Sequence, residues 1–131
     1  MIVLDASATL ELLLQTPTGQ ALLDRVLDPA ESLAAPHLLD LEVAQVLRRY
    51  VTGRQLEESR AAAALEDLRD LPMDRYPHAP FLPRIWELRQ HLTAYDAAYV
   101  ALAETLQAPL PTLDRGIANA PGHEARIELL A

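Results

Sequence analysis

The sequence predicts an α/β fold, a three-layer sandwich in which a central parallel sheet of about five short strands is flanked by helices. Short apolar runs alternate with segments of helical periodicity along the 131 residues, and this alternation implies parallel strands joined by right-handed crossovers. Half of the residues are hydrophobic, which is enough for one globular core. Because no repeat or long linker interrupts the pattern, we expect one domain over residues 1–131.

Five segments are expected as strands because they are short, mostly apolar and bounded by acidic or turn-forming residues. The expected strands are residues 1–4, 32–35, 73–76, 109–113 and 126–129. Pro109 and Pro111 flank the fourth of them, and proline cannot donate to a sheet ladder. We therefore expect this strand to be short or partly unpaired.

The helices are predicted from apolar spacing and from residues that start or stop a helix. Pro17 lies near a first turn, where its missing N–H costs least, and Gly53 and Pro72 end the third and fourth helices. Residues 77–83 contain three prolines and are expected as a loop. The expected helices are residues 7–14, 16–27, 37–51, 56–71, 84–91 and 92–104.

The composition excludes several classes of site. The formal net charge is -8 and all 11 basic residues are Arg, so mechanisms that need a catalytic Lys are excluded. The absence of Cys excludes disulfides and thiolate metal ligands. The acidic total argues against a protein that coats nucleic acid, but it permits an enzyme that meets phosphates through a bound cation. No apolar stretch approaches the ~18 residues of a membrane span, and we expect a cytoplasmic protein.

Four carboxylates are expected at one edge of the sheet. Asp5 and Asp114 come directly after the first and fourth predicted strands. Glu42 and Asp96 lie in the early turns of helices, and helix N-termini converge where the parallel strands end. Clustered ionised acids would repel one another, so a positive partner is expected. Oxygen ligands without Cys select a hard cation, Mg²⁺ or Mn²⁺, which activates water for phosphodiester cleavage.

Each acid also has a purely structural interpretation. Asp5 and Asp114 could cap the helices that follow them, and Glu42 could be an ordinary surface acid. Thr93 and Asp96 match a capping box, in which the Asp96 carboxylate accepts from the N–H of the N-cap residue. These roles explain the acids singly but do not predict that all four converge.

Neighbouring polar residues are weaker candidates. Ser7 and Thr112 each lie two residues from an acid, and their hydroxyls could hold a carboxylate or a bound water. Local capping is the alternative for both. Asp40 lies two residues before Glu42 and points away from its helix face, so we expect solvent or the helix start as its environment.

Four stretches in the order MIVLDASA, LLDLEVAQVLRR, LTAYDAAYVALAE and LPTLDRGIANAPG resemble the acid motifs of the PIN-domain family, specifically the VapC-type toxins of bacterial toxin–antitoxin pairs. The resemblance covers essentially the full chain. It implies a PIN-like sandwich and a Mg²⁺- or Mn²⁺-dependent endoribonuclease that acts as a homodimer. It also implies a VapB-like antitoxin that masks the site. Pro111 departs from the pattern, because a branched apolar residue often precedes the TxD motif in the family, and this could alter the loop that carries Asp114.

The resemblance implies that Asp5, Glu42, Asp96 and Asp114 form the acidic pocket. In this interpretation Asp5 and Asp96 are the first choices as direct metal ligands, while Glu42 and Asp114 complete the shell or orient water. RNA would be positioned by arginines near the acids in sequence, namely Arg48, Arg49 and Arg115. Two other classes stay open: a catalytically silent module that binds a partner, and a phosphoacceptor signalling domain, which the missing Lys disfavours.

Overall fold

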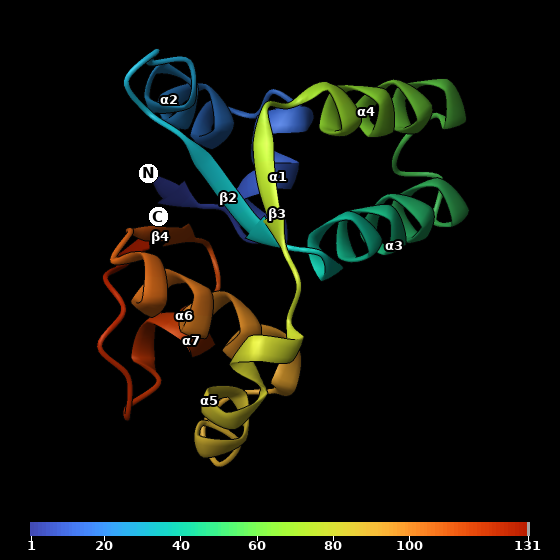
Figure 1. Cartoon of the computed structure of the whole chain (residues 1–131). Coiled ribbons are helices and arrows are strands. Elements are labelled where there is room, and N and C mark those ends of the chain that lie inside the picture. Colours follow the sequence, from blue (N-terminus) through green and yellow to red (C-terminus); the bar gives the residue numbers. More distant parts are fainter. Residues whose placement is uncertain (131) are drawn as a thin grey trace.

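The computed structural model describes residues 1–130, in which helices surround a small set of central strands (Figure 1). The strands are β1 (Ile2–Val3), β2 (Leu33–Pro36), β3 (Met73–Tyr76), β4 (Leu110–Thr112) and β5 (Ile127–Leu129). The helices, with the short 3-10 turn η1 (Ala79–Phe81), are α1 (Ala6–Leu13), α2 (Pro17–Val26), α3 (Leu38–Thr52), α4 (Glu58–Asp70), α5 (Leu82–Glu87), α6 (Ala94–Leu106) and α7 (Arg115–Asn119).

The strands are parallel and form two hydrogen-bonded ladders. β1, β2 and β3 pair in that order, with Val3 opposite Ala34, while β4 pairs with β5. A backbone hydrogen bond of 3.0 Å, from the Val3 N–H to the Pro109 carbonyl, joins β1 to the start of β4. The order across both ladders is therefore β3-β2-β1-β4-β5, and the predicted α/β class with parallel strands is confirmed.

Proline explains why the five strands do not form one continuous ladder. The Leu110 N–H donates to the Arg126 carbonyl beside β5 at 2.9 Å, so the nitrogen of the next residue points toward β1. That residue is Pro111, which has no N–H to donate. The expectation of a short strand is confirmed, since β4 has 3 residues.

The predicted loop over residues 77–83 is partly wrong. Its second half folds as η1 and the start of α5, and α5 ends at Glu87 rather than at residue 91. Pro80 and Pro83 lie in the first turns of these two elements, where a missing N–H breaks no helical bond. The limits of the other expected helices differ from the prediction by a few residues, and α7 was not among the expected helices.

Helices bury the strands on both faces. On one face, Val3 and Ala34 pack in the same core as α6, in which every residue from Ala97 to Ala103 is buried. On the other face, Ile2 packs with apolar side chains of α1 and α2. Side chains of a strand alternate between the two faces, and strands buried on both are typical of parallel sheets between helices. The three-layer arrangement follows from this alternation.

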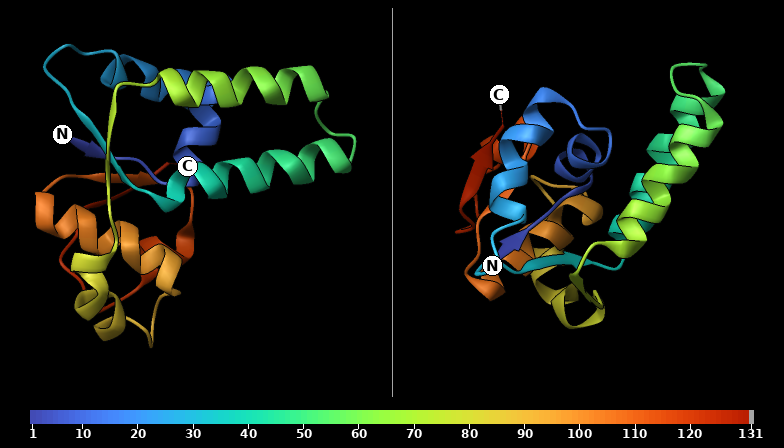
Figure 2. Two further views of the ribbon diagram at one scale, coloured as in Figure 1. Left: turned by 45° about the vertical axis from the view of Figure 1, so that its right-hand side comes forward. Right: turned by 90° about the horizontal axis from the view of Figure 1, so that it is seen from above.

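Helices α3 and α4 lie side by side and project beyond the strands (Figure 2). Arg75 of β3 ties the base of α3 to the sheet by donating to both carboxylate oxygens of Asp40, at 2.8 and 3.0 Å. Asp40 is therefore engaged in an ion pair that joins α3 to β3. Within residues 1–130, none of the helices has the length and apolar character needed to cross a bilayer.

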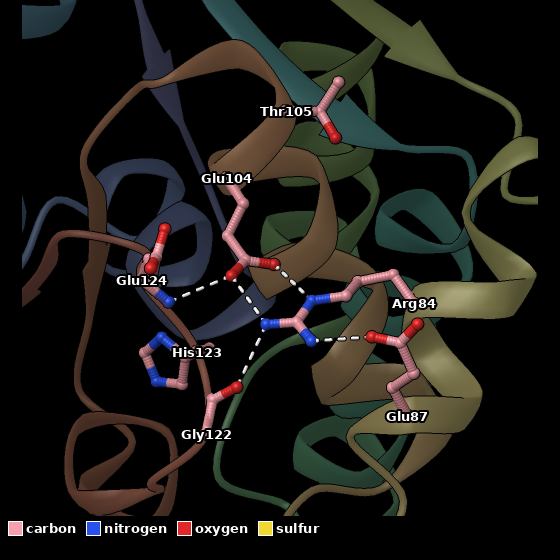
Figure 3. Close-up of a pocket in the computed structure, with 7 residues that line it drawn as sticks. All are labelled: Arg84, Glu87, Glu104, Thr105, Gly122, His123 and Glu124. Atoms are coloured by element: carbon pink, nitrogen blue, oxygen red, sulfur yellow. Dashed lines mark hydrogen bonds and ion pairs between the residues drawn. The ribbon is translucent and has the colours of Figure 1, made fainter.

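A cluster of charged side chains fastens the C-terminal segment to α5 and α6 (Figure 3). Arg84 donates to both carboxylate oxygens of Glu104 and to Glu87, each at 2.9 Å. It also donates to the Gly122 carbonyl at 3.0 Å, and Glu104 accepts from the Glu124 N–H at 2.9 Å. Hydrogen bonds from Arg84 hold the pKa of the Glu104 carboxyl below its usual range. The cluster lines a pocket of about 690 Å³ and fixes the segment that leads into β5.

Replacing Arg84 with Met should lower the free energy of unfolding by about 1 kcal/mol at pH 7, because Glu104 loses a bidentate partner in a partly exposed site. The folded-state pKa of Glu104 is lowered, so this stabilisation is complete above the ordinary value of 4.5 and is lost as the pH falls below it. Urea denaturation at pH 7 and pH 3 measures the difference. Arg69→Met, at an exposed arginine that forms no ion pair with residues 1–130, is the control. An equal difference at both pH values would contradict the ion-pair explanation.

Candidate functional site

The candidate site lies where the strand order reverses. β2 and β3 extend to one side of β1, whereas β4 and β5 lie on the other. Such a switch point leaves a crevice at the carboxyl ends of the strands, where ligands of open α/β folds bind. Asp5 follows β1 and Asp114 follows β4, so these two acids lie beyond the carboxyl ends of the two strands that meet at the switch point. Glu42 and Asp96 approach it from the early turns of α3 and α6.

Asp5 is the most buried of the four acids, with 4% of its surface exposed. One carboxylate oxygen accepts from the Ser7 hydroxyl at 2.8 Å and from the Ala8 N–H at 2.9 Å, the bond that caps α1. The other oxygen accepts from the Thr112 hydroxyl at the end of β4. Asp5 therefore caps α1 and also joins two segments that are distant in the sequence. A role as a helix cap is thus compatible with a place in the acid set.

Ser7 and Thr112 link the ends of β1 and β4. Their hydroxyl oxygens are 3.3 Å apart, and the Ser7 oxygen accepts from the Leu113 N–H at 3.0 Å. The Thr112 oxygen accepts from the Asp114 N–H at 3.0 Å. The Asp114 carboxylate in turn caps α7 by accepting from the Gly116 N–H at 2.7 Å. Side-chain hydrogen bonds thus hold the ends of β1 and β4 together.

A tyrosine that the sequence analysis does not single out holds Glu42. The Tyr99 hydroxyl donates to the Glu42 carboxylate, and Tyr99 is only 2% exposed. Burial and the neighbouring Glu42 raise the pKa of Tyr99 far above its usual range, so the hydroxyl stays a donor. Tyr99 follows Asp96 by three residues and shares its side of α6. The three-residue spacing from Asp96 could have indicated that Tyr99 lies near the acids. An aromatic residue in an apolar helix is, however, more typical of the core.

Thr93 and Asp96 form only half of the expected capping box. The Thr93 hydroxyl accepts from the Asp96 N–H at 3.1 Å and caps α6. The return bond, from the Thr93 N–H to the Asp96 carboxylate, is not among the hydrogen bonds of residues 1–130. The Asp96 carboxylate is half-buried at the start of the helix and is not engaged in that return bond.

Burial and mutual repulsion raise the pKa of three of the four carboxyls above their usual range, those of Asp5, Glu42 and Asp96. Loss of hydration is the largest cause in each. The charge of Asp114 adds to it at Asp5 and Asp96. The charges of Asp96 and Asp5 add to it at Glu42. Acids from four separate segments therefore act on one another electrostatically at one site.

The donor set of this site consists of carboxylate and hydroxyl oxygens, which fits a hard divalent cation such as Mg²⁺ or Mn²⁺. A positive ion would relieve the repulsion that raises these pKa values. Within residues 1–130, no three His, Asp or Glu side chains are grouped closely enough to bind one ion directly. The arrangement matches a site in which one or two carboxylates contact the ion and water fills the other positions.

The three arginines expected near RNA are exposed. Arg48 and Arg49 lie along α3, and Arg115 directly follows Asp114 at the start of α7. None of them forms an ion pair with any of residues 1–130. Their guanidinium groups are therefore available to anionic groups from outside the chain.

Comparison with known proteins gives the family of the chain. A family model described as PIN domain matches residues 2–122. Ribonuclease VapC12 from Mycobacterium tuberculosis is 42% identical over 131 residues, which cover 100% of both chains. Ribonuclease VapC9 from the same organism is 48% identical over 114 residues, covering 87% of this chain and 86% of its own.

Solved structures share the fold. PAE2754 from Pyrobaculum aerophilum superposes with a TM-score of 0.72 at 23% identity, covering 96% of this chain and 81% of that one. VapBC2 from Rickettsia felis, bound to a DNA fragment from its promoter, gives 0.73 at 14% identity, covering 100% of each chain. The chain therefore belongs to the PIN-domain family and, within it, to the VapC group, as the sequence resemblance implied.

Replacing Thr112 with Val should lower the free energy of unfolding by about 1.5–3 kcal/mol near pH 8, because the buried Asp5 carboxylate loses a hydroxyl donor while the side-chain volume is kept. That donor lowers the pKa of Asp5, so its removal raises this pKa further. The loss of stability should shrink as the pH falls and Asp5 takes up a proton. Chemical denaturation at pH 8 and pH 5 measures both values.

The control for this experiment is Thr105→Val, which removes an exposed hydroxyl that donates to the Ala101 carbonyl within α6. We expect this change to be close to neutral at both pH values. If the loss caused by Thr112→Val were the same at pH 8 and pH 5, the stabilisation would not depend on the charge of Asp5.

Proposed function

We propose that this chain is a metal-dependent endoribonuclease that acts as the toxin of a VapBC-type toxin–antitoxin pair. The observation that carries the proposal is the electrostatic coupling of four acids, from segments spread over the chain, at the switch point of a parallel sheet. Relatives named ribonucleases support the reaction class. The similarity to VapBC2 supports the same assignment at the level of the fold.

The four acids have two different roles in this proposal. Asp5 and Asp96 hold the cation, while Glu42 and Asp114 complete its shell through bound water that they orient. When bound, Mg²⁺ or Mn²⁺ supplies positive charge beside the scissile phosphate and lowers the pKa of water. The chain's own contribution is to keep the carboxylates ionised, oriented and close together.

Neighbouring hydroxyls perform that orienting function. Ser7 and Thr112 donate to Asp5, and their hydrogen bonds favour its ionised form. Tyr99 donates to Glu42 and lowers its pKa in the same way. Each of the two carboxylates is thereby restrained before a cation arrives, which favours a fixed ligand geometry.

The proposed substrate is RNA, positioned by the exposed Arg48, Arg49 and Arg115. A formal net charge of -8 makes the chain as a whole repel a polyanion. Binding must therefore depend on the cation, on these few guanidinium groups and on contacts that carry no charge. The proposed location is the cytoplasm, where such a toxin meets cellular RNA.

Replacing Asp96 with Asn should lower the rate of RNA cleavage at least about a hundredfold, because the cation loses a charged ligand while the helix cap from Thr93 is kept. Calorimetric titration with Mn²⁺ should show weaker binding to the same variant. Cleavage of a short RNA by the purified protein, with and without EDTA, measures the first effect.

Asp74→Asn is the matched control, since it removes one exposed carboxylate on β3 outside the acid set. We expect its cleavage and Mn²⁺ binding to equal those of the wild type. Cleavage that continued undiminished in excess EDTA would refute the metal-dependent mechanism. Failure of the wild type to cleave RNA in Mn²⁺, with partner binding intact, would identify a silent binding module instead.

Two partners complete the proposal: a second copy of the chain and a VapB-like antitoxin that covers the site. Large apolar side chains are exposed on α5, for example Trp86 and Leu82, so apolar surface is available for protein contacts. Light scattering should give twice the chain mass of 14.5 kDa for the purified protein. A mass equal to one chain at micromolar concentration would exclude a stable homodimer.

A further inference from the structure

A groove of about 480 Å³ lies between the start of α3 and the start of α6, beside the acids. Its apolar wall comes from Leu38, Leu41 and Val46 of α3, and the ring of Tyr95 lines it from α6. Two of these side chains are strongly exposed, Leu41 at 76% and Tyr95 at 65%. Exposed apolar and aromatic side chains next to a charged site are typical of a binding surface.

The polar edge of the groove follows one face of α3. Glu42, Gln45 and Arg49 are spaced by three and four residues, so their side chains follow one another along the helix. Glu42 belongs to the acid set, which makes the groove continuous with the proposed metal site. Gln45 is exposed, and Arg49 has no ion-pair partner among residues 1–130.

We propose that this groove binds a nucleobase of single-stranded RNA next to the scissile phosphate, with the base stacked on the Tyr95 ring. The inference rests on the proposed function and adds a substrate subsite to it. Tyr95 lines the groove together with Glu42 of the acid set, so a base held on the ring lies beside the proposed metal site. Gln45 and Arg49 supply the donors and the acceptor that read base edges in single strands.

The net charge of the chain limits how it can hold RNA. RNA-binding proteins usually gain affinity from phosphates through clustered Lys and Arg, but this chain carries a formal net charge of -8 and no Lys. Stacking on an aromatic ring does not depend on charge, so it is the contact that an acidic ribonuclease can use. A groove that combines an exposed ring, apolar walls and two hydrogen-bonding side chains provides that contact.

Tyr95→Ala should raise the KM for a short single-stranded RNA about tenfold in Mn²⁺, with little change in kcat, and should alter which base is preferred beside the cut. Tyr95→Phe keeps the ring and should recover most of the lost affinity. Leu27→Ala, at an apolar residue that is 67% exposed at the end of α2 and outside the groove, is the control. Tyr95 is exposed, so these variants should keep the stability of the wild type.

A binding measurement makes the inference testable apart from catalysis. An oligonucleotide that carries 2-aminopurine is titrated onto Asp114→Asn and onto the same variant with Tyr95→Ala. We expect quenching of the 2-aminopurine fluorescence by the first protein, and about tenfold weaker binding with the quenching lost in the second. If the wild type cleaves no RNA, the proposed function fails, and this titration still decides whether the groove binds a base.

Unchanged KM and unchanged oligonucleotide affinity in Tyr95→Ala would overturn the inference while leaving the ribonuclease proposal intact. A Tyr95→Ala variant with wild-type RNA affinity but an altered mass in light scattering would also overturn it, because the groove would then be a contact between protein chains.

Discussion

The site depends on one physical constraint, the close approach of like charges in partly buried surroundings. Such charges lose hydration and repel one another, so a fold that contains them must supply compensating groups. Around Asp5 these groups are the Ser7 and Thr112 hydroxyls and the Ala8 N–H, which lower a pKa that burial raises. Their compensation is incomplete, since the pKa stays above its usual range. A cation bound at this site would relieve the remaining imbalance.

Local signals in the sequence predict much of the fold. The apolar run before Asp5 marks a strand that passes directly into a helix, and Gly53 marks the end of α3. The effect of Pro111 was predictable because it follows from one missing donor. The two prolines at the starts of η1 and α5 were misread, because a first-turn proline and a loop proline look alike without knowledge of the residues that follow.

The candidate site was predictable only in part. The positions of the four acids relative to strand ends and helix starts could be inferred, and in the structure their charges contribute to the raised pKa values of Asp5, Glu42 and Asp96. The roles of these acids as metal ligands stay a prediction. The donor to Glu42 comes from Tyr99, whose distance in sequence gives no hint of contact, and the Arg84 cluster likewise joins segments that are far apart along the chain. Contacts of this kind depend on tertiary packing, which periodicity does not encode.

The join between the two ladders has a consequence for how this fold can evolve. Among residues 1–130, the backbone joins the two ladders through the hydrogen bond from Val3 to Pro109. Beyond the carboxyl ends of β1 and β4, the side chains of Asp5, Ser7 and Thr112 connect them by hydrogen bonds. In the proposed function, the residues that join the two ladders are therefore also residues of the site. A descendant that lost the cleavage activity could not freely substitute these residues. Other contacts would first have to replace the hydrogen bonds that join the two ladders.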